Sequence, residues 1–144
     1  MLWTENFLGG FDSAWSLGRA LGSDTLPSVQ LVEDTPALTP YGSFWSPLET
    51  AVHNPPDRWV SGVMATAASP GDPVFYLHHC MIDLLWAHWQ LRHPGEDRYQ
   101  ASGAGVGLHN PMPPWTTTPA DVLDHRSINT YDSPPGFVPD PSPE

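Results

Sequence analysis

The sequence predicts a mainly α-helical domain with extensive irregular loops, and three observations support this fold class. Between residues 73 and 92, apolar side chains recur every three or four residues, as they do along a long amphipathic helix. A second helix start, Ser-Pro-Leu-Glu, stands at residues 46–49. The 12 glycines and 18 prolines exceed ordinary usage and are typical of a loop-rich chain.

The long helix is expected over residues 73–92. Asp72 can cap it, and Pro73 fits the first helical position, where a missing N–H costs little. Pro94-Gly95 is a stop signal. Its apolar face, which we expect to be buried, is formed by Val74, Leu77, Met81 and Leu84 and is widened by Leu85 and Trp89.

The shorter helix is expected to begin at Ser46 and to end at His53. Ser46 can cap it and Glu49 can complete a capping box. Proline disfavours helical geometry at the residue before it, so Pro55-Pro56 predicts an end after about two turns.

Two of the seven histidines stand out by their position on these helices. His53 ends the shorter helix, and His79 lies in the longer one with Asp83 four residues later on the same face. Facing helices with inward histidines build metal sites in bundle cores, so His53 and His79 are candidate ligands. The alternative is a buried His79 that pairs with Asp83 and supports only the fold.

Residues 72–83 read Asp-Pro-Val-Phe-Tyr-Leu-His-His-Cys-Met-Ile-Asp, which resembles the second-copper signature of tyrosinases, catechol oxidases and hemocyanins. His53-Asn54 and residues 59–66 resemble the stretch that carries the first two ligands of that copper. The resemblance covers residues 1–11 and about 48–132. It implies half of a four-helix bundle, with one short and one long core helix, in which the half that carries the first copper is missing.

The resemblance also implies roles for single residues. His53 and His79 match copper ligands, and His78 matches the histidine beside the substrate pocket. Asn54 matches a residue that positions water or the phenol proton, and Asp83 matches a buried acid that supports the site. Copper is therefore the implied cofactor, and the alternative is a metal-free site.

One departure bears on the metal. The family's middle ligand lies four residues after the first, and Asp57 occupies that position, beyond Pro55-Pro56. Because the prolines predict a broken helix, Asp57 need not point toward His53. A His53–His79–Asp57 set would resemble a two-histidine, one-carboxylate site of the non-haem iron type. Without metal, His78 and His79 could serve as acid or base near neutral pH.

From the sequence we favour a small-molecule biosynthetic enzyme with a degenerate copper site. It would perform non-redox acid–base chemistry, such as cyclisation, isomerisation or addition, on an aromatic or conjugated substrate. Its candidate catalytic residues are His78, His79, Asp57 and Asn54. The alternatives are a copper-dependent phenol oxidase completed by a second chain or dimer, and a non-catalytic partner-binding or copper-handling module.

Charge and composition bound the partners and the location. The net charge of −11 opposes binding to nucleic acid and to anionic membranes. The N-terminus lacks a basic segment followed by an apolar run, so we expect no signal peptide and a cytoplasmic protein. Cys80 is the single cysteine, which excludes a disulfide within the chain, and we expect it to be buried.

Half of a bundle leaves an apolar face uncovered, and such a face usually marks an interface. We therefore expect a two-fold homodimer that covers this face, or a separately encoded partner that does so. The domain is expected to occupy residues 1–132, followed by a Pro-rich acidic tail at 133–144.

Overall fold

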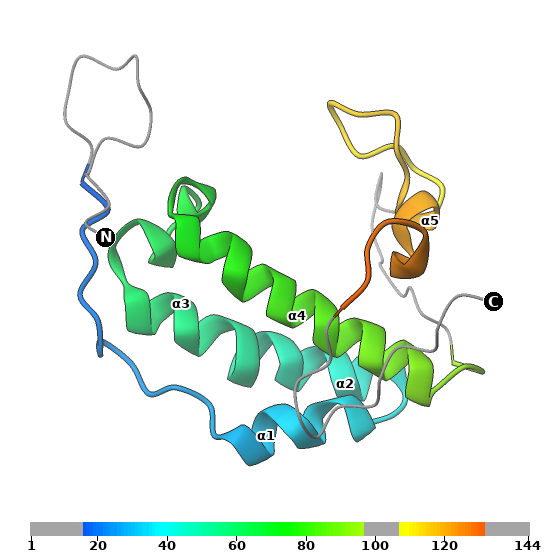
Figure 1. Ribbon diagram of the computed structural model, residues 1–144, viewed down its shortest axis with the longest axis horizontal. Helices are drawn as coiled ribbons and strands as arrows, with labels where there is room; N and C mark the ends of the chain where they lie inside the picture. The colour runs from blue at the N-terminus through cyan, green and yellow to red at the C-terminus, as the bar shows by residue number, and fades with distance from the viewer. Residues whose placement is uncertain (1–15, 97–106, 132–144) are drawn as a thin grey trace. The chain divides into compact units, whose positions relative to one another are not determined.

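The computed structural model describes residues 16–96 and 107–131, and within these ranges it contains helices and no strand (Figure 1). The predicted mainly α fold is confirmed. The chain divides into two compact units: Met1–Val32 with Pro47–Asp83, and Glu33–Ser46 with Leu84–Glu144. The predicted tail at 133–144 and the resemblance over residues 1–11 lie outside the described residues.

The elements follow one another as helices joined by short turns. The α-helices are α1 (Val29–Asp34), α2 (Tyr41–Pro47), α3 (Asn54–Val60), α4 (Pro73–Arg92) and α5 (Pro119–Val122). A π-helical segment, η2 (Leu48–His53), joins α2 to α3, and the 3-10 turns are η1 (Thr35–Ala37), η3 (Gly62–Ala65), η4 (Ser69–Gly71) and η5 (His125–Ser127). Within the described ranges, none of the helices combines the length and the apolar character that a bilayer span requires.

The predicted long helix is confirmed as α4, with its expected cap. Asp72 is fully buried, and its Oδ1 accepts a hydrogen bond from the N–H of Val74 at 2.9 Å. The same carboxylate pairs with the Arg19 guanidinium, whose Nε lies 2.8 Å from Oδ2. This bidentate contact ties the segment before α1 to the start of the helix that carries His78 and His79.

The predicted buried face of α4 is wrong in the first half of the helix. Leu77 is 75% exposed and Met81 39% exposed, and Cys80 is exposed as well. Of the six residues predicted to form that face, Leu84, Leu85 and Trp89 are buried, and all three lie in the second half of α4. Periodicity identifies a helix but not the side that meets a neighbour, and the first half of α4 turns its histidines inward.

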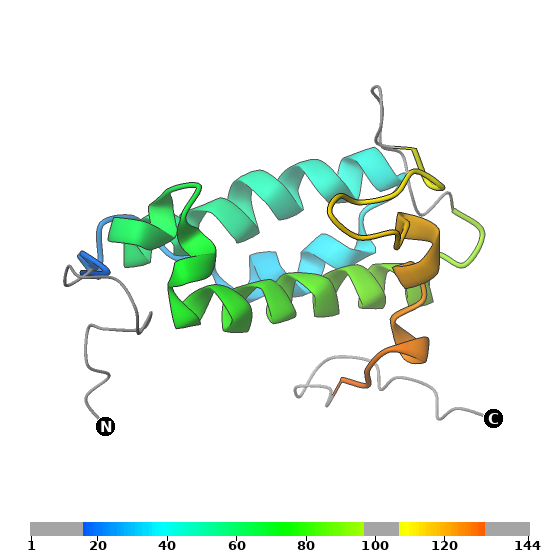
Figure 2. The ribbon, with the colours of Figure 1, turned by 90° about the horizontal axis from the view of Figure 1, so that it is seen from above.

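The predicted shorter helix is wrong at both ends. The chain is helical from Tyr41 to Val60 without interruption, through α2, η2 and α3 (Figure 2). The helix begins at Tyr41 because the N–H groups of Ser43 and Phe44 donate to the carbonyl of Pro40, at 2.8 and 3.3 Å. Ser46 therefore lies inside α2 and does not cap a helix.

Pro55-Pro56 does not end the helix, because both prolines fall in the first turn of α3. Proline is tolerated there because its missing N–H is not needed. The turn before it is π-helical, and the N–H of Asn54 donates to the carbonyl of Glu49, five residues back. Asp57 consequently stays one turn beyond His53 on the same side of the rod.

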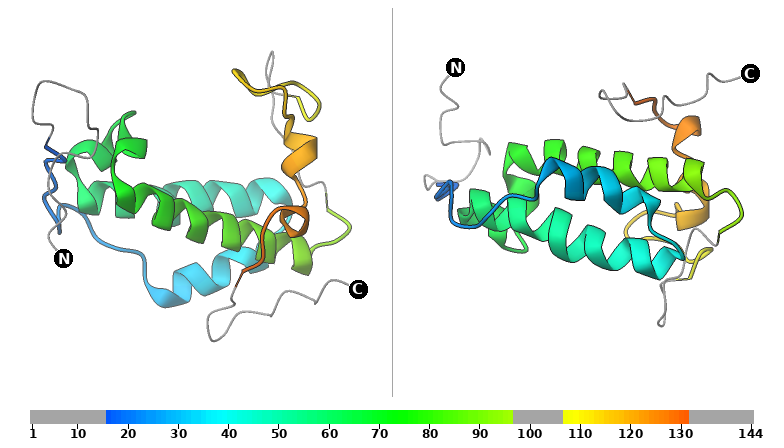
Figure 3. Two further views of the ribbon diagram at one scale, coloured as in Figure 1. Left: turned by 45° about the horizontal axis from the view of Figure 1, so that its top comes forward. Right: turned by 90° about the horizontal axis from the view of Figure 1, so that it is seen from below.

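Unit 1 holds the residues of interest. Its buried apolar side chains include Leu48, Val52, Val60 and Met64, which come from η2, α3 and η3. The η2–α3 rod runs alongside the first half of α4 (Figure 3). Backbone hydrogen bonds from Ala20 to Val60 at 2.9 Å and from Val63 to Leu17 at 2.8 Å add the segment before α1 to this unit.

Unit 2 is organised around Trp89 in the second half of α4. Its ring is fully buried, and it stacks on Phe44 with ring centroids 5.2 Å apart. The edge of Tyr41 meets it at 5.4 Å. The indole Nε1 donates to the carbonyl of Leu38 at 2.7 Å, so this large core side chain has its one polar group satisfied.

Candidate metal centre

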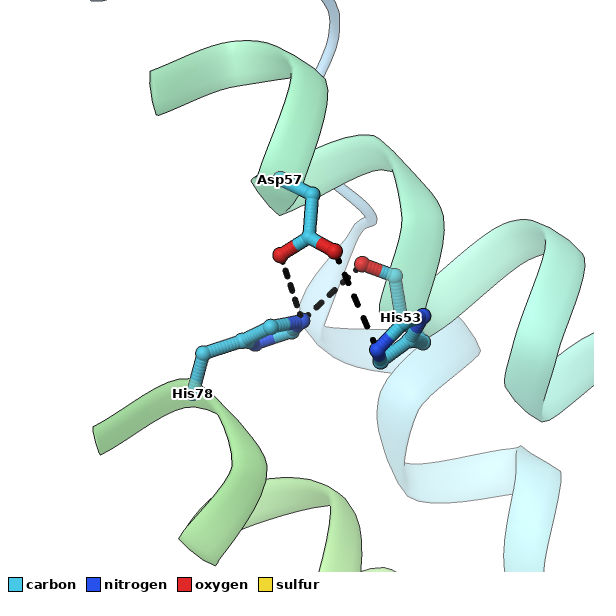
Figure 4. A group of neighbouring side chains, drawn as sticks. All are labelled: His53, Asp57 and His78. Atoms are coloured by element: carbon cyan, nitrogen blue, oxygen red, sulfur yellow. Dashed lines mark hydrogen bonds and ion pairs between the residues drawn. The ribbon is translucent and has the colours of Figure 1, made fainter. Parts of the chain in front are cut away.

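The predicted site residues of the two helices converge in unit 1. His53 ends η2 and Asp57 lies in the first turn of α3, while His78 and His79 lie in the second turn of α4. In Figure 4 the carboxylate of Asp57 and the ring of His53 point from one rod toward His78 on the other. The doubt raised by the prolines is thereby removed, because Asp57 faces the histidines.

His53 presents a ring nitrogen lone pair to the cluster. Its Nδ1 lies 3.0 Å from Asn54 Oδ1, an acceptor, so Nδ1 carries the proton and donates. In the neutral ring Nε2 is then free to accept a proton or bind a cation. Histidine ligands of metals commonly donate their other N–H in this way. Glu49 Oε2 lies 3.7 Å from the same Nδ1.

His79 faces His53 across the two helices. Their Nε2 atoms lie 3.3 Å apart. Two nitrogen ligands at about 2.0–2.1 Å from one metal in tetrahedral geometry lie about 3.3–3.4 Å apart, so this spacing fits a shared ion. The Phe75 ring, with its centroid 3.9 Å from that of His79, packs against the imidazole and restricts its orientation.

His78 has a different hydrogen-bond role. Its Nε2 lies 2.9 Å from the backbone carbonyl oxygen of His53, which can only accept. Nε2 of His78 therefore carries a proton, and its lone pair lies on Nδ1 instead. The rings of His53 and His78 stack with centroids 5.2 Å apart, so His78 supports the position of His53 from the side.

Asp57 lies between the two histidines of this stack. Its Oδ2 is 3.8 Å from His53 Nε2, and its Oδ1 is 3.7 Å from His78 Nε2. Ligand atoms of His53, Asp57 and His78 all lie within 4.8 Å of one another. Among the described residues, Oδ1 of Asp57 is buried without a hydrogen-bond partner. A bound cation would satisfy such an oxygen, so the donor set fits a metal ion.

Burial keeps two of the imidazoles neutral. It lowers the pKa of His78, and the nearby His53 carbonyl and Asp57 oppose that change. Burial likewise lowers the pKa of His79, and the neighbouring His53 and His78 lower it further. Both rings are therefore neutral at neutral pH, which is the state that binds a metal or accepts a proton.

The remaining predicted residues lie nearby on the same elements. Asn54 contacts His53 directly, as described above. Asp83 lies one turn beyond His79 on α4 and is partly buried. Sequence analysis missed Glu49 and Phe75, each of which stands four residues before a site histidine, a spacing that places two side chains on one helix face.

Comparison with known proteins shows the family to which the chain belongs. Residues 20–92 match the common central domain of tyrosinase, which is half of the chain. The chain belongs to the tyrosinase family, whose members bind copper.

Similarity to individual relatives extends further along the chain. It is 42% identical over 139 residues to a tyrosinase of Streptomyces antibioticus, covering 84% of this chain and 51% of that protein. It is 38% identical over 137 residues to grixazone synthase of Streptomyces griseus, covering 74% of this chain and 45% of that protein. A tyrosinase of Streptomyces glaucescens is 51% identical over 85 residues, covering 57% of this chain and 31% of that protein. The chain spans between about a third and a half of the length of these curated relatives.

Proposed function

We propose that this chain is a small-molecule biosynthetic enzyme of the tyrosinase family that acts on an aromatic, phenol-like substrate. We propose that it holds one metal ion in the cluster formed by His53, Asp57, His78 and His79. The observation that carries this proposal is the 3.3 Å separation of His53 Nε2 and His79 Nε2. The relatives named tyrosinase and grixazone synthase support the biosynthetic assignment.

His53 and His79 would hold the ion through their Nε2 atoms, with Asp57 as the third group. When bound, copper supplies redox chemistry. Asn54 holds the proton on Nδ1 of His53 and so keeps Nε2 available. Phe75 orients the His79 ring. The Nε2–H of His78 donates a hydrogen bond to the His53 carbonyl, which fixes the end of η2 against α4.

A second candidate function is metal-free acid–base chemistry on an aromatic or conjugated substrate, such as cyclisation, isomerisation or addition. The lowered pKa values of His78 and His79 favour it, because a neutral imidazole can accept a proton from a bound substrate. Asp57 would stabilise the imidazolium that forms, since its Oδ1 lies 3.7 Å from His78 Nε2.

Turnover with and without metal separates the two candidates. The full chain is freed of metal with a chelator, reloaded with copper, and assayed on monophenols and catechols. One assay uses the chain alone, and another adds the N-terminal half of the Streptomyces antibioticus tyrosinase. We expect turnover that requires copper and that is lost in His53→Ala and His79→Ala.

Turnover of an aromatic substrate that survives removal of metal would contradict the first function and support the second. Copper that binds in the cluster without turnover in either assay would indicate a copper-handling module instead. The Gly42→Ala variant, whose exposed position in α2 is remote in sequence from the cluster, serves as the control for handling of the protein.

A further inference from the structure

Asp57 gives the cluster a donor set that differs from three histidines. It stands four residues after His53, and the π-helical turn followed by α3 keeps it directed at the cluster. Its Oδ2 lies 3.8 Å from His53 Nε2. Its Oδ1 lies 3.7 Å from His78 Nε2, so each carboxylate oxygen faces a histidine nitrogen, and 17% of the side chain is exposed to solvent.

Without a cation this arrangement has one unfavourable feature. A buried carboxylate oxygen without a hydrogen-bond donor has lost its hydrating water, and no other interaction compensates for that loss. Within the described part of the chain, Oδ1 of Asp57 is such an oxygen. The Nε2 atoms of His53 and His79 lie 3.3 Å apart, which is also the spacing of two nitrogen ligands on one ion. A divalent cation held by these two nitrogens and by the Asp57 carboxylate would compensate the buried carboxylate.

His78 is the other histidine near Asp57, and its hydrogen bond argues against a role as ligand. Its Nε2–H is committed to the His53 carbonyl at 2.9 Å. The same N–H faces Asp57 Oδ1 at 3.7 Å, so a small movement of the carboxylate would bring it within hydrogen-bond distance. Metal-binding carboxylates are typically oriented by a donor of this kind.

We propose that His53, Asp57 and His79 form a site for a single divalent cation with two nitrogen donors and one carboxylate oxygen, and that His78 is a positioning residue that orients Asp57. This inference rests on the proposed function, because it assumes that the cluster binds metal. A carboxylate favours harder divalent ions such as Fe²⁺, Co²⁺ and Zn²⁺ over Cu⁺. The metal ion that this site prefers therefore differs from the ion preferred by a site of three histidines.

The first test measures dissociation constants of Co²⁺ and Cu⁺ for the full chain and for two variants of Asp57. Asp57→Asn keeps the size and removes the charge, and we expect it to weaken Co²⁺ binding by at least about tenfold. Asp57→His supplies a third imidazole, and we expect it to raise the affinity for Cu⁺ relative to Co²⁺ by at least about tenfold. Unchanged constants in both variants would overturn the inference.

The second test separates positioning from ligation at His78. His78→Gln retains an N–H donor, and His78→Phe retains a ring without one. We expect His78→Phe to lose about 10–100-fold in Co²⁺ affinity and His78→Gln to retain most of it, with an unchanged visible Co²⁺ spectrum. A spectrum that changes in both variants, with equal losses of affinity, would make His78 a ligand and overturn its assigned role.

Failure of the proposed function looks different from failure of this inference. If the wild-type chain binds neither ion, the metal-dependent function fails. If metal binding is lost in His53→Ala and His79→Ala but is unchanged in both Asp57 variants, the proposed function stands and the inference fails. Helical circular dichroism and the melting temperature of each variant establish that the fold is retained.

Discussion

At the scale of single residues, Gly62 occupies a position that only glycine fits. Its φ is +60°, and a Cβ atom built there would lie 2.2 Å from the carbonyl oxygen of Leu17 and 2.4 Å from that of Gly18. The Val63 N–H donates to the same Leu17 oxygen, so the two segments are held together at this point. A side chain would have to push them apart.

We therefore expect Gly62→Ala to lower the free energy of unfolding by at least about 2 kcal/mol, through backbone strain and overpacking. Gly42→Ala is the matched control, because Gly42 lies in α2 with open space around it and alanine is the better helix former. Urea unfolding measures both. A Gly62→Ala variant as stable as the wild type would contradict the close approach.

Asp72 is a second residue with a measurable role. The Arg19 guanidinium holds the pKa of this carboxyl below its usual value of 3.8, against the opposing effect of burial. A carboxyl with a lower pKa in the folded state stabilises the fold above its unfolded pKa, and this stabilisation is lost as the pH falls. Asp72 also caps α4 through Val74.

We expect Asp72→Asn to cost about 1–3 kcal/mol of stability at pH 7. The difference from the wild type should shrink as the pH falls below about 4. Thermal unfolding across pH 2–7 measures it. Asp24→Asn is the control, because the Asp24–Arg58 pair is exposed and should matter much less. A difference between wild type and Asp72→Asn that grows in acid would rule out this account of the ion pair.

At the scale of the elements, α4 could be predicted from sequence because its limits are set by local signals. Asp72 and Pro73 begin it, and Pro94-Gly95 follows its end. The end of the other helix at Val60 could not be predicted, because Pro55-Pro56 is compatible both with a helix end and with the first turn of a new helix. Which of the two occurs depends on the π-helical turn at η2, and no local residue pattern indicates that turn.

The same distinction applies to the site. The motif around His78 and His79, together with the position of His53 on a facing helix, predicts that these histidines lie close together, as they do in the structure. The direction of Asp57 was not predictable, because it follows from the continuous rod. The division of roles between His78 and His79 also required structure, since it depends on the single hydrogen bond from His78 to the His53 carbonyl.

At the scale of the whole molecule, the exposed face of α4 bears on assembly. Four apolar or weakly polar side chains share it: Tyr76, Leu77, Cys80 and Met81. We propose that a second copy of the chain covers this face in a two-fold dimer, as expected from the sequence. The net charge of −11 on each chain opposes association, so the dimer should tighten as salt screens the repulsion.

Light scattering should give the mass of a dimer for the wild-type chain and of a monomer for Leu77→Glu combined with Met81→Glu. Leu21→Glu, at a residue that is 64% exposed elsewhere in unit 1, is the control and should remain dimeric. A monomeric wild type at micromolar concentration, in low and in high salt, would be incompatible with the dimer.

The central claim is that the cluster formed by His53, Asp57, His78 and His79 binds a metal ion, and elemental analysis of the purified chain after metal loading and gel filtration tests it most directly. We predict about one divalent ion per chain for the wild type and for Gly42→Ala, and its loss in His53→Ala and in His79→Ala. A wild-type chain that retains no metal, or variants that retain as much as the wild type, would contradict the claim.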